Sequence, residues 1–83
     1  MAEYYARYLM GYGPNRKHIK EARRDGVSYL NHHPDTNRVV IMKETTDNIV
    51  GVGDIRSSGT GKTYRVRKTG KTYKVKSDGS LIG

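Results

Sequence analysis

A phosphate-binding loop is the first chemistry that the residue types suggest, because Gly61-Lys62-Thr63 is the tail of the pattern G-x-x-x-x-G-K-[ST]. The pattern requires a glycine five residues before Gly61, and Arg56 stands at that position. It also requires a helix after the threonine, whose N-terminus faces the phosphate. Residues 63–68 instead alternate in polarity, with β-branched and aromatic side chains, which predicts a strand. The sequence therefore argues against a nucleotide-binding loop.

The adjacent pair His32-His33 is the other candidate for chemistry, and Pro34-Asp35 follows it. Neighbouring side chains of an extended segment point to opposite sides, so such a pair rarely binds one metal ion. A metal site needs further ligands in a fixed geometry, and Asp35 and Glu44 stand at no recognised spacing. The chain has no cysteine nucleophile and no evident pair of catalytic carboxylates. We expect a polar loop here, and a protein that is not an enzyme and has no catalytic residue, metal or cofactor.

The residues around Gly61 are repeated nine positions later. Residues 60–67 read T-G-K-T-Y-R-V-R, and residues 69–76 read T-G-K-T-Y-K-V-K. Each copy consists of a glycine turn followed by a strand pattern, and residues 68–71 would form a hairpin tip in which Gly70 can adopt a positive φ. The repeat predicts two adjacent antiparallel strands.

Side chains of a strand alternate between the two faces of its sheet, so the repeat also predicts two different faces. One face packs on a core and carries Tyr64, Val66, Tyr73 and Val75. The opposite face carries Thr63, Arg65, Arg67, Thr72, Lys74 and Lys76. Four cations without an acid indicate a surface that contacts phosphate. The alternative is an ordinary solvated face, because lysine and arginine also protect exposed strands against aggregation.

The overall charge points in the same direction. Sixteen lysines and arginines stand against eight acidic residues, for a net charge of +8 and a pI near 9.9. An excess of this kind indicates a polyanionic partner such as DNA or RNA and, less often, an anionic membrane or an acidic protein surface. The absence of cysteine, of a membrane-spanning run and of a signal peptide predicts a cytoplasmic protein with no membrane contact.

Two helices are expected in the N-terminal third. Residues 2–10 place tyrosines on one helical face, although a strand is the alternative because tyrosine also favours β structure. Residues 16–25 predict a second helix, with Asn15 as its N-cap and Gly26 as its stop. This helix is strongly basic, so it is either a second contact with nucleic acid or a solvated surface helix. Its cations are Arg16, Lys17, Lys20, Arg23 and Arg24.

The remaining residues predict mostly strands. We expect a short strand at residues 27–30, a loop at 31–37, a central strand at 38–43 that a helix covers, and a strand with a bulge at 49–55. A loop at residues 57–59 and a short final strand at 81–82 complete the pattern. The sum is one small domain over residues 1–83, of the α+β class. Its N-terminal helices pack on one face of a mostly antiparallel β-sheet that ends in a basic β-hairpin.

The function predicted from the sequence is non-enzymatic binding of nucleic acid through contacts to the phosphate backbone. The residues predicted to make these contacts are Arg65, Arg67, Lys74, Lys76, Lys62, Lys68, Lys71, Arg16, Lys17, Lys20, Arg23 and Arg24. DNA is favoured over RNA, because sheets that bind single strands usually expose aromatic side chains and the predicted basic face has none.

The alternative is a small protein-interaction module. It would be an accessory or inhibitor protein that docks on an acidic or nucleic-acid-handling partner, and its edge strands could pair with a partner sheet. A homo-oligomer stays open, since a core this small would gain from burial between subunits.

Overall fold

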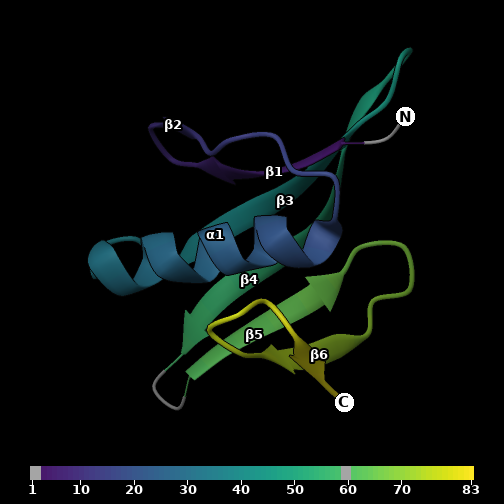
Figure 1. Cartoon of the computed structure of the whole chain (residues 1–83). Coiled ribbons are helices and arrows are strands. Elements are labelled where there is room, and N and C mark those ends of the chain that lie inside the picture. The colour runs from purple at the N-terminus through teal and green to yellow at the C-terminus, as the bar shows by residue number, and fades with distance from the viewer. Residues whose placement is uncertain (1–2, 59–60) are drawn as a thin grey trace.

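The computed structural model describes residues 3–58 and 61–83, in which one helix packs on one face of a seven-stranded sheet (Figure 1). The elements are β1 (Glu3–Tyr8), β2 (Gly11–Tyr12), α1 (Ile19–His32), β3 (Arg38–Glu44), β4 (Ile49–Ser58), β5 (Gly61–Val66), β6 (Thr72–Val75) and β7 (Leu81–Ile82). The strand order is β2-β1-β3-β4-β5-β6-β7, and each neighbouring pair is antiparallel. The predicted α+β class, with helical structure on one face of an antiparallel sheet, is confirmed.

The N-terminal segment is a strand, so the helix predicted at residues 2–10 is wrong over the residues described; Ala2 lies outside them. β1 pairs with β3 from Glu3 to Arg7, and a further bridge joins Tyr4 to Arg16. Tyr4, Ala6 and Tyr8 face α1, whereas Tyr5 and Arg7 face the other way. The spacing of the tyrosines fits both the helical period and the strand period. Pairing with the edge of β3 is possible only for the strand.

A single helix replaces the predicted helix at 16–25 and the predicted strand at 27–30. α1 begins after His18, whose side chain makes no capping bond, so Asn15 is not its N-cap. Gly26 is buried in the middle of α1 and is not a stop. A Cβ atom there would lie 3.0 Å from Ile55 Cδ1 and 3.1 Å from Val39 Cγ1. The glycine therefore lets the helix approach the sheet closely, which offsets the roughly 1 kcal/mol that glycine costs within a helix.

The core lies between α1 and the sheet. Its buried side chains are Ala6, Ala22, Val27, Leu30, Val39, Ile41, Ile55, Tyr64 and Val75. β3 is the central strand expected at residues 38–43, and its alternate residues Val39 and Ile41 are fully buried beneath α1. The covered face of the sheet therefore contributes the larger part of the core.

The two copies of the repeat are adjacent antiparallel strands, as predicted, with Tyr64 opposite Tyr73. Gly70 has a φ of +74° in the turn between them. The sheet does not end at this hairpin, because β7 adds a strand beyond β6. β4 extends through Ser58, so Ser57 and Ser58 are in a strand and not in the predicted loop. Gly59, the last residue of that loop, and Thr60, the first of the repeat, lie outside the described residues.

The glycines of β4 accompany a bulge, as expected. The register of β3 against β4 shifts between Ile41 and Met42, where Gly51 and Gly53 lie opposite. The ring of Tyr64 occupies the position that a Cβ atom on Gly53 would need. The guanidinium of Arg23 lies over the same ring, 5.2 Å from its centroid. Gly53 thus makes room for the largest fully buried side chain of the core.

We predict that Gly53→Ala lowers the free energy of unfolding by about 2 kcal/mol, because the added methyl group displaces the Tyr64 ring from a packed core. Urea unfolding followed by circular dichroism measures the change. Gly83→Ala is the matched control, since its Cβ atom would meet Tyr73 only at an ordinary contact distance of 3.8 Å. Equal stability of Gly53→Ala and the wild type would contradict this account of the core.

Candidate nucleic-acid interface

The face of the sheet opposite α1 is covered by no element of the described chain, and we call it the open face. Its side chains follow from the strand registers, because residues directly opposite on neighbouring strands share a face. One row across the sheet contains Arg7, Val40, Asp54, Arg65 and Thr72. The next row contains Arg38, Arg56, Thr63 and Lys74. Basic side chains therefore span the open face from β1 to β6.

Four of these basic side chains are exposed and make no ion pair with any described residue. They are Arg7, Arg56, Arg65 and Lys74, and we call them the open-face cations. Arg56 lies directly opposite Arg38, and like charges in such a cross-strand pair repel each other. Arg65 and Lys74 belong to the set predicted from the sequence. Arg7 was assigned to a helix, and Arg56 lay beyond the predicted end of its strand, so neither was recognised.

Asp54 is the one acid in these two rows, and it engages two arginines. Arg67 donates two hydrogen bonds of 2.9 Å to its carboxylate, and Arg38 Nε lies 3.4 Å from Oδ1. The hydrogen bonds from Arg67 are the main reason why the pKa of Asp54 is lowered from 3.8, and the positive charges of Arg67, Arg38 and Arg56 contribute. Arg67, a predicted phosphate contact, is therefore held by Asp54.

The basic helix lies on the other side of the sheet from the open-face cations. A flat ligand on the open face cannot touch α1, so the two surfaces predicted from the sequence do not form one interface. Arg16 precedes α1 and donates two hydrogen bonds, of 2.8 and 3.1 Å, to Asp25. The hydrogen bond to Asp25 is the main cause of the raised pKa of Arg16. Arg24 is exposed on α1, and Lys17 is exposed in the segment before it.

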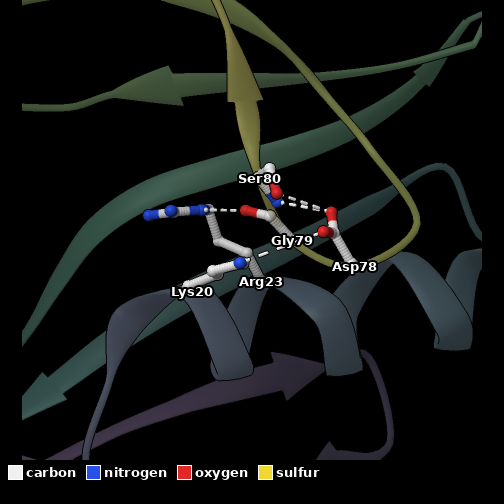
Figure 2. Close-up of polar contacts among 5 residues, drawn as sticks. All are labelled: Lys20, Arg23, Asp78, Gly79 and Ser80. Atoms are coloured by element: carbon white, nitrogen blue, oxygen red, sulfur yellow. Dashed lines mark hydrogen bonds and ion pairs between the residues drawn. The ribbon is translucent and has the colours of Figure 1, made fainter.

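Two further cations of the predicted helix hold the C-terminal turn, as Figure 2 shows. Arg23 Nε donates a 2.8 Å hydrogen bond to the Gly79 carbonyl, and Lys20 Nζ lies 3.9 Å from Asp78. Gly79 has a φ of +92° and lies directly against the backbone of Lys20, where a side chain would not fit. Asp78 also accepts hydrogen bonds from the backbone and hydroxyl of Ser80. Arg23 thus holds the C-terminal turn against α1, and the exposed ion pair of Lys20 adds little to this contact.

The other predicted cations lie outside the two open-face rows. Lys62 is opposite Ser57 on the side of the sheet that α1 covers. Lys68 and Lys71 are exposed in the turn between β5 and β6, and Lys76 is exposed directly after β6. Whether these residues bind anything stays a prediction.

The two histidines end the helix. His32 is the last residue of α1 and His33 its C-cap. Their Nδ1 atoms lie 2.8 and 2.9 Å from the carbonyls of Ser28 and Tyr29, so each ring donates a hydrogen bond to the helix end. His33 also stacks on Tyr29, with ring centroids 3.8 Å apart. Within residues 3–58 and 61–83, no group of three or more His, Cys, Asp or Glu side chains is placed to hold a metal ion.

Two aromatic side chains on the open face were not anticipated. Tyr12 of β2 lies opposite Arg7, and Tyr5 of β1 lies opposite Met42. The tyrosine rings are 5.7 Å apart, and Tyr12 is 75% exposed. The alternation of residues 4–8 was the signal that could have placed Tyr5 there, had the segment been interpreted as a strand.

Comparisons with protein-family models, with curated proteins and with solved structures find no match to this chain. Along the described chain, no helix has the length and apolar character needed to cross a membrane. Inference about function therefore starts from the open face itself.

The ion pairs of Asp54 predict a specific dependence of stability on pH. A carboxyl group whose pKa is lowered by folding stabilises the fold above its unfolded pKa, and this contribution is lost as the pH falls through the folded value. We expect Asp54→Asn to lower the free energy of unfolding by about 0.5–1 kcal/mol at pH 7, since both arginines are partly exposed. The difference from the wild type should shrink as the pH falls below 3.8.

Urea unfolding of both proteins at neutral and acidic pH measures this difference. The matched control is Asp47→Asn, which removes the same charge from an exposed turn residue that makes no ion pair within the described part of the chain. A stability difference for Asp54→Asn that stays constant from pH 7 to pH 3 would refute the assignment.

Proposed function

We propose that this protein is a non-enzymatic nucleic-acid-binding protein whose open face contacts the phosphate backbone. The observation that carries the proposal is the set of four open-face cations, which are exposed and not neutralised by a described acid. Phosphates at regular spacing along a nucleic acid would relieve the repulsion between these side chains. The net charge of +8 adds a long-range attraction that speeds encounter with a polyanion.

The internal contacts of the chain narrow the set of cations that can bind a ligand. Arg16, Lys20 and Arg23 were predicted to contact nucleic acid, but each already has a partner within the chain. Arg67 and Arg38 are ion-paired with Asp54, so they contribute less to binding than side chains that make no ion pair with a described residue. The phosphate contacts are therefore assigned to Arg7, Arg56, Arg65 and Lys74.

A protein partner is the second candidate, and one observation favours it. Leu9 and Met10, at the tip of the turn between β1 and β2, are 81% and 89% exposed. Exposed apolar side chains at one edge of a sheet are a feature of protein interaction surfaces. In that case the isolated protein would show only weak attraction to polyanions, which salt removes.

We expect a variant with Arg56→Ser, Arg65→Ser and Lys74→Ser to bind labelled oligonucleotides more weakly than the wild type. The slope of log K against log salt should become shallower by about 2, because each lost phosphate contact removes about 0.7–0.9 from it. Fluorescence anisotropy from about 0.05 to 0.2 M salt measures both quantities over the range where phosphate contacts dominate.

The matched control removes three cations that lie outside the two open-face rows, in a Lys17→Ser, Arg24→Ser and Lys62→Ser variant. It has the same net charge as the open-face variant, so any difference between the two reports the location of the contacts. An equal loss of affinity in both variants would sink the assignment to the open face. Absence of binding by the wild type at about physiological salt would instead favour the protein partner.

A further inference from the structure

The open face is divided into a basic region and an aromatic region. The open-face cations extend from β1 to β6, whereas the aromatic and apolar side chains gather over β2, β1 and the adjoining ends of β3 and β4. Tyr5, Tyr12, Met42 and Ile49 line a hollow of about 430 Å³ there. Tyr12 and Ile49 are strongly exposed, at 75% and 56%. We call these four residues the aromatic end.

The aromatic end adjoins the basic region without a break. Arg7, Leu9 and Met42 line both this hollow and a second one of about 700 Å³. The second hollow is also lined by Val40 and by Arg38 and Arg67, the two arginines that pair with Asp54. A ligand that follows the open face from the aromatic end therefore passes Arg7 before it reaches the cations of β4 to β6.

The presence of both a basic and an aromatic region on the open face favours a single strand over a duplex as its ligand. A duplex keeps the faces of its bases stacked inside and offers a sheet only phosphates, sugars and groove edges. A single strand offers phosphates together with unstacked base faces, which bind exposed aromatic rings. A surface made only for duplex phosphates would gain nothing from the exposed ring of Tyr12, packed beside the half-buried Tyr5, next to its cations.

We propose that the open face binds single-stranded nucleic acid, with bases stacked on Tyr12 and Tyr5 and phosphates along the open-face cations. The inference rests on the proposed function and deepens it. It also removes the reason for favouring DNA over RNA, which was the absence of an exposed aromatic side chain on this face. Stacking tolerates any base and either sugar, so the shared feature of the ligand is the single strand.

Substitution of Tyr12 tests the stacking. We expect Tyr12→Leu to weaken binding of single-stranded oligonucleotides about fivefold or more, because it removes an aromatic surface and retains an apolar side chain. Tyr12→Phe keeps the ring and should bind as the wild type does. The salt slope of Tyr12→Leu should equal that of the wild type, since no phosphate contact is lost. Anisotropy titrations with single-stranded DNA, single-stranded RNA and a duplex measure these effects.

A single-tryptophan variant gives a direct signal, because the chain contains no tryptophan. The emission of Tyr12→Trp should be quenched by a single strand of either DNA or RNA. An abasic strand of the same length, which keeps the phosphates and lacks the bases, should bind more weakly and leave the emission unchanged. The DNA and RNA arms also report which sugar the face prefers.

The outcomes separate this inference from the proposal on which it rests. Duplex binding as tight as single-strand binding, with no effect of Tyr12→Leu, would overturn the single-strand inference. The open-face cations would then still account for binding to the phosphate backbone. Failure of every oligonucleotide to bind at about physiological salt would overturn both.

Discussion

The close approach of α1 to the sheet at Gly26 is the constraint on which the rest of the structure depends. Ile55 and Val39 reach into the space that a side chain at this position would fill. The helix thereby covers the middle of the sheet, and the buried residues of α1 pack against β1, β3 and β4. The described residues contain no second helix on the other side of the seven-stranded sheet. One-sided packing of this kind leaves the opposite face to solvent or to a partner.

The two sides of the sheet use their paired cations differently. On the helix side, three cations join separate segments of the chain: Arg16 pairs with Asp25, Arg23 with the Gly79 carbonyl and Lys20 with Asp78. Arg23 and Lys20 join the C-terminal turn to α1 (Figure 2), and Arg16 joins the segment before α1 to Asp25. On the open face, Asp54 partners two arginines and the other cations have no acidic partner among the described residues. Salt in the solvent weakens the repulsion between these unpaired cations and does not remove it.

The tyrosines also differ between the two sides of the sheet. Tyr64 is buried between Gly53 and Arg23, and Tyr8, Tyr29 and His33 form a stack beside the C-terminal end of the helix. These rings stabilise the contact between α1 and the sheet. Tyr5 and Tyr12 lie on the opposite side, where no described element packs over Tyr12. Tyrosine suits both settings, because its ring packs against apolar or planar groups and its hydroxyl remains compatible with water.

The sequence alone determined the features that depend on neighbouring residues. The alternation of β-branched and polar residues in 60–76 specified two strands with a core face, and Gly70 specified the turn between them, because strand periodicity and glycine backbone freedom are local properties. The charge of the chain likewise follows from composition. Tertiary contacts decided the rest. The spacing of residues 4–8 fits a helix or a strand, and pairing with β3 makes them a strand. Gly26 fits a helix end in the sequence, but it lies within α1 because the helix packs closely on the sheet there. The open face itself, with Arg7, Tyr5 and Tyr12 beside Arg65 and Lys74, exists only because strands distant in sequence pair with one another.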